Sequence, residues 1–408
     1  MENNETPTKS EIQIASEIPP LSEPFREFYD PNGYFEGDDT ALMGWLYERR
    51  HGKSVMVDTA DGPRELTVRE QFAFELCTQT VLDKDNCAEW TGLGLTADEL
   101  GSIVDVAEYN AQKTAGLVKE AVEILKQNAS IADRIRGLED KGESAWIDVL
   151  LAGAVVASLG HEGQRRMSGH EFIMHPVSVT TLVTMAMRRV KGYLKQKNGI
   201  FTLRLAQYIG LNHDVDEDGL PDQLDTVGTS FWNVRGFKTY PLLHKRVLEA
   251  VGVDAIVAGQ TAQQIRALTK HSGHAILVTV AGTNETKLKT RTENSRYIGT
   301  VGKWALARLV KLADMYHNSK LDQKERPIAD KRALAIWENN QAEYDSNTKI
   351  LQEVVRNEED ESEILVAKKI LKLRSRELIK YRNKKILGLL ATELVSDAYK
   401  QAQDKLAA

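Results

Sequence analysis

Apolar residues recur at helical spacing along most of this chain, and this periodicity constrains the fold more than any other feature. Four stretches carry it: residues 97–128, 146–159, 176–194 and 304–318. Apolar residues that recur every three or four positions are typical of a helix with one buried face. Pro176 opens the third stretch, where the missing N–H of a proline costs nothing. The sequence therefore predicts a mainly α fold.

The 408 residues allow two or three domains. Residues 1–25 are rich in polar residues and proline and predict a disordered lead-in. Residues 26–140 predict a mostly helical accessory region, with a small hairpin at 53–66 around an Asp61-Gly62 turn. Residues 141–345 form the expected central unit. Residues 346–408 predict a charged helical tail, whose basic segment, 367–390, we expect to pack on its own domain rather than bind RNA, lipid or a partner helix.

Bulk composition excludes several classes of protein. The net charge of −6 does not favour a nucleic-acid or membrane-surface partner. Cys77 and Cys87 lack the partners of a disulfide framework or a zinc–thiolate site. No apolar run approaches the roughly 18 residues of a membrane span, and no secretory signal opens the sequence. We therefore expect a cytoplasmic protein, with an oligomeric state that the sequence leaves open.

A candidate metal site centres on His213 and Asp214, which follow an apolar helical stretch at 201–210. His175 upstream and Asp314 downstream supply two further ligand types. A mixed set of imidazole and carboxylate suits Mn²⁺, Fe²⁺ or Zn²⁺. Such an ion lowers the pKa of a bound water and polarises a phosphoryl oxygen. These residues predict a metal-dependent phosphohydrolase.

Two helical spacings extend this site. Glu217 and Asp218 lie four positions after His213 and Asp214, so on a helix they would share a face with the metal pair. There they would orient or deprotonate the attacking water, although a solvated acidic helix end has the same pattern. Asn318 lies four positions after Asp314, where its amide would reach a substrate.

The same region supports a second interpretation. Residues 214–225 place Asp at five ligand positions of a calcium-binding EF-hand loop and glycine at its sixth position. Asp225 stands where that loop has glutamate, and Pro221 stands where it has an apolar residue. A third alternative is a protein that senses a nucleotide without turning it over, although such a protein has no need of Glu217 and Asp218.

Four segments, in order, resemble the HD-type hydrolase domain of the RelA/SpoT family. Residues 161–176, His-Glu-Gly-Gln-Arg-Arg-Met-Ser-Gly-His-Glu-Phe-Ile-Met-His-Pro, resemble its opening motif. Residues 213–219, His-Asp-Val-Asp-Glu-Asp-Gly, resemble "H-D-V-V-E-D-T", and residues 293–296 resemble "E-N-x-R". Residues 310–318, Val-Lys-Leu-Ala-Asp-Met-Tyr-His-Asn, resemble "I-K-L-A-D-R-L-H-N". The resemblance covers about residues 145–325, and nothing resembling the family's synthetase is present.

This resemblance implies an all-helical hydrolase that removes the 3′-pyrophosphate from the nucleotide (p)ppGpp of the stringent response, with Mn²⁺ as cofactor. Glu217 and Asp218 would activate water, and Arg166 and Asn318 would contact the substrate. The implied metal ligands are those already singled out: His175, His213, Asp214 and Asp314. Residues 141–345 would be the hydrolase domain.

The chain departs from the family near the expected substrate. Met167 replaces a lysine, Met315 replaces an arginine, and Asp216 replaces an apolar residue and adds charge beside the metal pair. The metal site is therefore better supported than the substrate.

Overall fold

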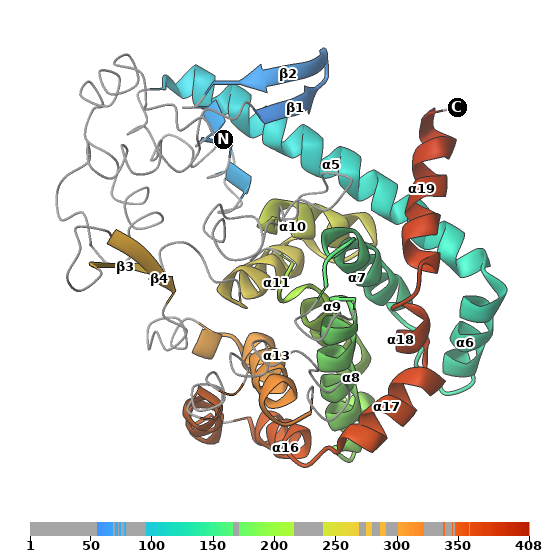
Figure 1. Ribbon diagram of the computed structural model, residues 1–408. Coiled ribbons are helices and arrows are strands. Elements are labelled where there is room, and N and C mark those ends of the chain that lie inside the picture. The colour runs from blue at the N-terminus through green and yellow to red at the C-terminus, as the bar shows by residue number, and fades with distance from the viewer. Residues whose placement is uncertain are drawn as a thin grey trace. The chain divides into compact units, whose positions relative to one another are not determined.

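The protein is mainly α-helical, as its periodicity predicts (Figure 1). The computed structural model describes the greater part of the chain: residues 55–67, 95–165, 171–215, 240–268, 301–321, 347–358 and 360–407, single residues at 70, 71, 73, 74, 77, 78, 338 and 345, and the backbone of two further strands, Ala275–Thr279 and Thr286–Thr290. Among the helices in these segments, none combines the length and apolar character needed to cross a membrane. The chain divides into two compact units, which are described separately.

The first unit contains the predicted hairpin. Strands β1 (Val55–Thr59) and β2 (Gly62–Leu66) pair antiparallel, with Thr59 opposite Gly62. Gly62 has φ of 119°, which glycine adopts without strain, so the predicted Asp61-Gly62 turn is confirmed. The backbone N–H of Asp58 donates to Asn110 Oδ1 at 3.3 Å, and Asn110 Nδ2 donates back to the Asp58 carbonyl at 2.7 Å. The hairpin is thereby fixed to the first half of α5 (Ala97–Gln127). Strands β3 (Ala275–Thr279) and β4 (Thr286–Thr290) pair in this unit as well.

Three helices form the centre of the second unit: α7 (Ile147–Gly160), α8 (Met174–Arg189) and α9 (Gly199–Asn212). Helix α7 is apolar on every side and almost wholly buried, as a core helix must be. Small residues let α9 approach both neighbours closely. A Cβ on Gly153 of α7 would lie 3.0 Å from the Tyr208 ring, and one on Gly210 of α9 would lie 2.7 Å from Thr180 Oγ1. This packing sets the positions of the ends of α8 and α9.

Further helices enclose this centre. α10 (Pro241–Ala250) packs on α11 (Ala255–Leu268), and α13 (Ala305–Tyr316) packs on α8, α9 and α11. Arg308 of α13 makes a buried two-pronged ion pair with Glu363 of α16 (Glu361–Ile370), through Nε–Oε1 and Nη2–Oε2 contacts of 2.8 Å. Such paired geometry satisfies both charged groups inside the fold.

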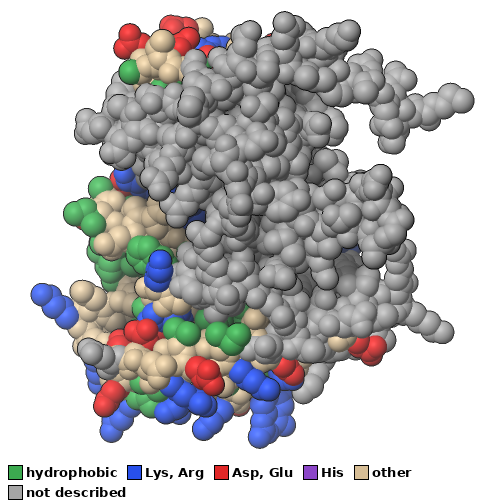
Figure 2. Space-filling view, turned by 90° about the vertical axis from the view of Figure 1, so that its left-hand side faces the viewer, with side chains coloured by type: hydrophobic (Ala, Val, Ile, Leu, Met, Phe, Trp, Pro, Cys, Tyr) green, Lys and Arg blue, Asp and Glu red, His purple; other side chains and the backbone are tan. Residues whose placement is uncertain are grey.

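The C-terminal helices pack on the same unit. Helices α16, α17 (Ser375–Lys384) and α18 (Ile386–Leu389) contact α8, and α19 (Leu394–Ala407) contacts α7. The apolar residues Ile370, Leu373, Leu378 and Leu387 are buried, so the basic segment 367–390 packs on the fold as expected. Most of its charged residues are exposed, whereas Arg382 is buried and donates to Ser178. Figure 2 shows Lys and Arg side chains gathered along the lower edge of that view, with Asp and Glu among them.

Candidate metal centre

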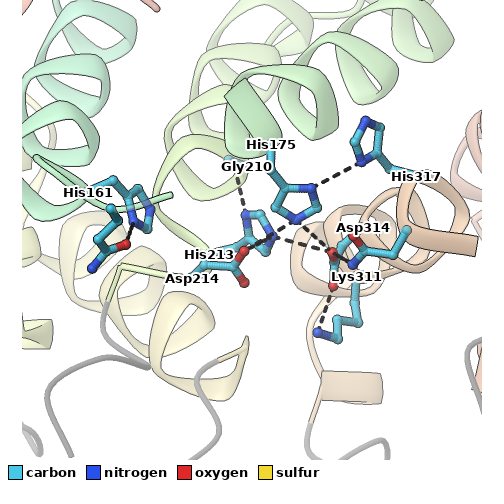
Figure 3. A network of polar contacts seen from close by, with 10 residues as sticks. His161, His175, Gly210, His213, Asp214, Lys311, Asp314 and His317 are labelled. Atoms are coloured by element: carbon cyan, nitrogen blue, oxygen red, sulfur yellow. Dashed lines mark hydrogen bonds and ion pairs between the residues drawn. The ribbon is translucent and has the colours of Figure 1, made fainter. Parts of the chain in front are cut away.

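The four predicted ligands meet in the second unit (Figure 3). His175 lies in the first turn of α8, and His213 and Asp214 directly follow α9. Asp314 lies on α13. Helix packing brings these segments together because α8, α9 and α13 contact one another. Three separate stretches of chain therefore supply one cluster.

The ring nitrogens and carboxylate oxygens face each other at short range. Nε2 of His175 lies 3.0 Å from Oδ1 of Asp314 and 3.3 Å from Oδ2 of Asp214. Nε2 of His213 lies 3.1 Å from the same Asp214 oxygen and 3.7 Å from Oδ1 of Asp314. The ligand atoms of His175, His213 and Asp214 all lie within 4.8 Å of one another. This separation is what a shared divalent ion requires.

The orientation of His213 leaves one nitrogen for a ligand. Its Nδ1 lies 2.9 Å from the Gly210 carbonyl oxygen, so Nδ1–H donates to the backbone and Nε2 is the nitrogen that a metal would bind in place of a proton. That Nε2 is buried and makes no hydrogen bond to any described residue. A buried polar atom without a hydrogen bond needs another partner. A metal ion fits this position.

The charged groups of the cluster shift one another's pKa values. Burial opposes the charged form of His213, but the Asp214 and Asp314 carboxylates outweigh it and raise the pKa of His213 to about 10. Burial also opposes ionisation of Asp214, yet His213 and His175 bring the pKa of that carboxyl well below its usual range. The pKa of Asp314 is likewise lowered against burial, chiefly by Lys311. Both carboxylates are thus ionised and directed at imidazole nitrogens.

Two residues that were not predicted from the sequence contact the candidate ligands. Lys311 contacts Asp314, and His317 contacts His175. Lys311 Nζ lies 2.8 Å from Asp314 Oδ2, one helical turn away. His317 presents its Nδ1 to Nδ1 of His175 at 3.1 Å. Helical spacing from Asp314 would have indicated Lys311. The contact between His317 and His175 joins two helices far apart in sequence, so no spacing signals it.

Asn318 is placed differently from its predicted role. Its Nδ2 donates to Oδ1 of Asp314 at 2.7 Å, within the π-helical turn η6 (His317–Leu321). The amide therefore supports a candidate ligand in this structure, and its contact with a substrate stays a prediction.

His161, which opens the first motif, lies near the cluster. Its Nδ1 is 2.9 Å from Gln164 Oε1, and its ring packs 4.7 Å from that of Phe172. Burial lowers the pKa of His161 to about 4, although Gln164 and Asp214 oppose the shift. The ring is therefore neutral at physiological pH.

Several predictions lie outside the described residues: Arg166, Glu217, Asp218 and all of the 214–225 loop beyond Val215. Their roles stay predictions.

Comparisons with models of protein families, with curated proteins and with solved structures give no match to this chain. The assignment of the site therefore depends on its geometry and on the sequence motifs.

Proposed function

We propose that this chain is a metal-dependent phosphohydrolase whose ion is held by His175, His213, Asp214 and Asp314. One observation carries the proposal: four residues singled out from the sequence as ligands converge from three segments, with nitrogen–oxygen distances of 3.0 to 3.7 Å. Solvated acidic or histidine-rich surfaces do not give this arrangement, because both imidazoles are buried.

The donor set fits a borderline divalent cation. Two imidazole nitrogens and two carboxylates favour Mn²⁺, Fe²⁺ or Zn²⁺ over metals that prefer thiolate. When bound, such an ion supplies a Lewis acid for a phosphoryl oxygen and lowers the pKa of water. Lys311 and Asn318 each bind one oxygen of Asp314, and so fix the carboxylate in position. The Gly210 carbonyl fixes the ring of His213.

The leading substrate is a nucleotide carrying a pyrophosphate, with (p)ppGpp first because of the motifs at residues 161–176, 213–219 and 310–318. Glu217 and Asp218 are the proposed water-activating pair. Arg166 is the proposed phosphate contact, since a guanidinium matches phosphate geometry. Met167 and Met315 stand where the family has basic residues, so GTP, dGTP and NADPH belong in the same substrate panel.

Metal analysis and a turnover assay test the proposal together. The purified chain should carry about one Mn, Fe or Zn per molecule, and with Mn²⁺ it should release phosphate or pyrophosphate from at least one of the four nucleotides. Nucleotide binding without release would identify a sensor, and calcium uptake without hydrolysis would identify the EF-hand alternative.

Three substitutions separate the roles. Asp214→Asn should abolish metal binding, because it removes a carboxylate from the cluster. Glu217→Gln should keep the metal and lose rate. Asp404→Asn, which makes the same change at an exposed position of α19, is the control and should retain both. Full turnover by Glu217→Gln would remove the role assigned to that residue.

A further inference from the structure

A second polar site lies away from the metal cluster, toward the C-terminal end of α8. A cavity of about 210 Å³ opens between α6 (Ala129–Glu139), the last turns of α8, the middle of α9, and α17 with α18. Arg188, on its wall, is 13 residues along α8 from His175, which corresponds to about 20 Å of helix. The cavity is thus separate from the cluster of His and Asp residues.

The floor of the cavity is buried and hydrogen-bonded. Arg204 Nη1 donates to Gln207 Oε1 at 2.8 Å, and Gln207 Nε2 donates to Thr184 Oγ1 at 3.0 Å. The other guanidinium donors of Arg204 bind the backbone carbonyls of Ala145 and Glu143. No carboxylate of the described residues forms an ion pair with Arg204. Its guanidinium is therefore held inside the fold by neutral acceptors, with the Glu143 carboxylate as the nearby negative charge that favours its charged form.

Basic side chains dominate the whole lining. Six Lys and Arg residues and a single acidic residue, Asp133, contribute to it; the basic ones are Arg134, Lys141, Arg188, Arg204, Lys384 and Lys385. The Asp133 carboxylate pairs with Arg136, which is not part of the lining. Glu143 pairs with Arg188. Glu143 thus offsets one of these charges, and the remaining basic side chains leave the lining with an excess of positive charge.

Like charges are crowded here. Burial lowers the pKa of Lys385, and the neighbouring Lys141 and Arg188 lower it further. Burial likewise lowers the pKa of Arg204 to about 10, with Arg188 acting in the same direction. An arrangement in which cations destabilise one another is relieved by an anion between them.

The size of the cavity limits what the anion is. Pockets for drug-sized ligands measure roughly 300 to 1,000 Å³, so about 210 Å³ holds phosphoryl groups rather than a whole nucleotide. Arginine and lysine are the residues that bind phosphate in proteins. We propose that this cavity is a binding site for a small phosphate polyanion of the pyrophosphate class, held over Arg204 by Lys141, Arg188 and Lys385.

This proposal does not depend on hydrolysis at the metal centre. The test is titration calorimetry of the full chain with inorganic pyrophosphate in excess EDTA, so that no divalent ion recruits the anion elsewhere. We expect one pyrophosphate per chain. Lys141→Gln with Lys385→Gln should weaken binding by at least about tenfold, because two charge-assisted contacts are lost. Both lysines lie on the rim, so the fold should tolerate the change.

The matched control is Lys119→Gln with Lys400→Gln, which removes the same charge from two exposed lysines outside the lining. It should change the affinity by less than about twofold. Hydrogen exchange should show protection of α6 and α17 on adding pyrophosphate. Absence of binding at millimolar pyrophosphate, equal loss in both double variants, or protection confined to other elements would each overturn the proposal.

Discussion

The contact between His317 and His175 predicts a role for a residue that binds no metal itself. When Nε2 of His175 binds a metal, its Nδ1 carries the hydrogen and would donate to Nδ1 of His317, which lies 3.1 Å away. Partners of this kind fix the ring of a ligand histidine, and their loss typically costs about 10- to 100-fold in metal affinity. We therefore expect His317→Phe to weaken Mn²⁺ binding by about that factor.

The conservative variant separates orientation from packing. The amide oxygen of His317→Gln can still accept the hydrogen bond, so this variant should recover most of the affinity in calorimetric titration with Mn²⁺. Equal affinities in the wild type and His317→Phe would show that His317 does not position His175.

His161 predicts a dependence of stability on pH. Burial lowers its pKa from the ordinary 6.5 to about 4, so below pH 6.5 the unfolded chain binds a proton that the folded chain excludes. The stability that this group contributes above pH 6.5 is therefore lost as pH falls toward 4. Between pH 7 and pH 5 the loss is about 2 kcal/mol.

Urea unfolding in EDTA at those two pH values measures the effect. The free energy of unfolding should fall between pH 7 and pH 5 in both proteins. The fall should be smaller by about 2 kcal/mol in His161→Asn than in the wild type. Asp214 and Asp314 lose stability in acid in both proteins, so the comparison isolates His161. Parallel curves for the two proteins would contradict the assignment.

At the scale of helices, the close approach of α8 and α9 makes Gly210 intolerant of a side chain. A Cβ there would lie 2.7 Å from Thr180 Oγ1 and 3.3 Å from Thr180 Cα. Gly210→Ala must push the helices apart, at a cost of about 1 to 3 kcal/mol. Because the Gly210 carbonyl also binds His213, metal affinity should fall as well.

Gly116 of α5 provides the matched substitution, because no atom lies within 4 Å of an added Cβ there. Gly116→Ala should stabilise the protein by up to about 1 kcal/mol through helix propensity alone. Chemical denaturation of both variants tests the contrast. A shift of the same sign in both would falsify the packing argument.

The apolar pattern predicted which stretches are helical, but it did not predict where some of these helices begin and end. The apolar pattern at 176–194 located α8, but the helix begins at Met174, because any first-turn position tolerates proline. It ends at Arg189, ahead of Gly192, whose φ of 81° is incompatible with the helix. The pattern at 304–318 continues into a π-helical turn, which apolar spacing does not reveal.

The candidate site was predictable to a similar degree. Motifs and residue types located the four candidate ligands, whose convergence needed only helix packing. The contact of Lys311 with Asp314 could be predicted from their spacing on one helix. The His175–His317 contact and the basic cavity depend on elements that meet only in the tertiary structure, from Asp133 to Leu387, so one-dimensional patterns could not show them.

At the scale of the whole molecule, a bound ion should act as a cross-link. His175, Asp214 and Asp314 belong to three segments that separate on unfolding, so an ion binds the folded state alone. At a concentration 100 times its Kd, it adds about 2.7 kcal/mol to the free energy of unfolding. Calorimetric melting should show a higher Tm with Mn²⁺ than with EDTA.

Asp314→Asn should lose that increase in Tm, while Asp404→Asn should retain it. An unchanged Tm for the wild type with saturating Mn²⁺ would argue against an ion bridging the three segments.

Helix α8 has its first turn at the metal cluster and its last turns at the basic cavity, and α9 lines the cavity with Arg204 and Gln207 before it ends beside His213. Two sites joined by the same pair of helices obey a thermodynamic cycle. If pyrophosphate in the cavity changes the affinity for Mn²⁺ by some factor, Mn²⁺ must change the affinity for pyrophosphate by the same factor. The two titrations thus yield one coupling free energy, measured from either site.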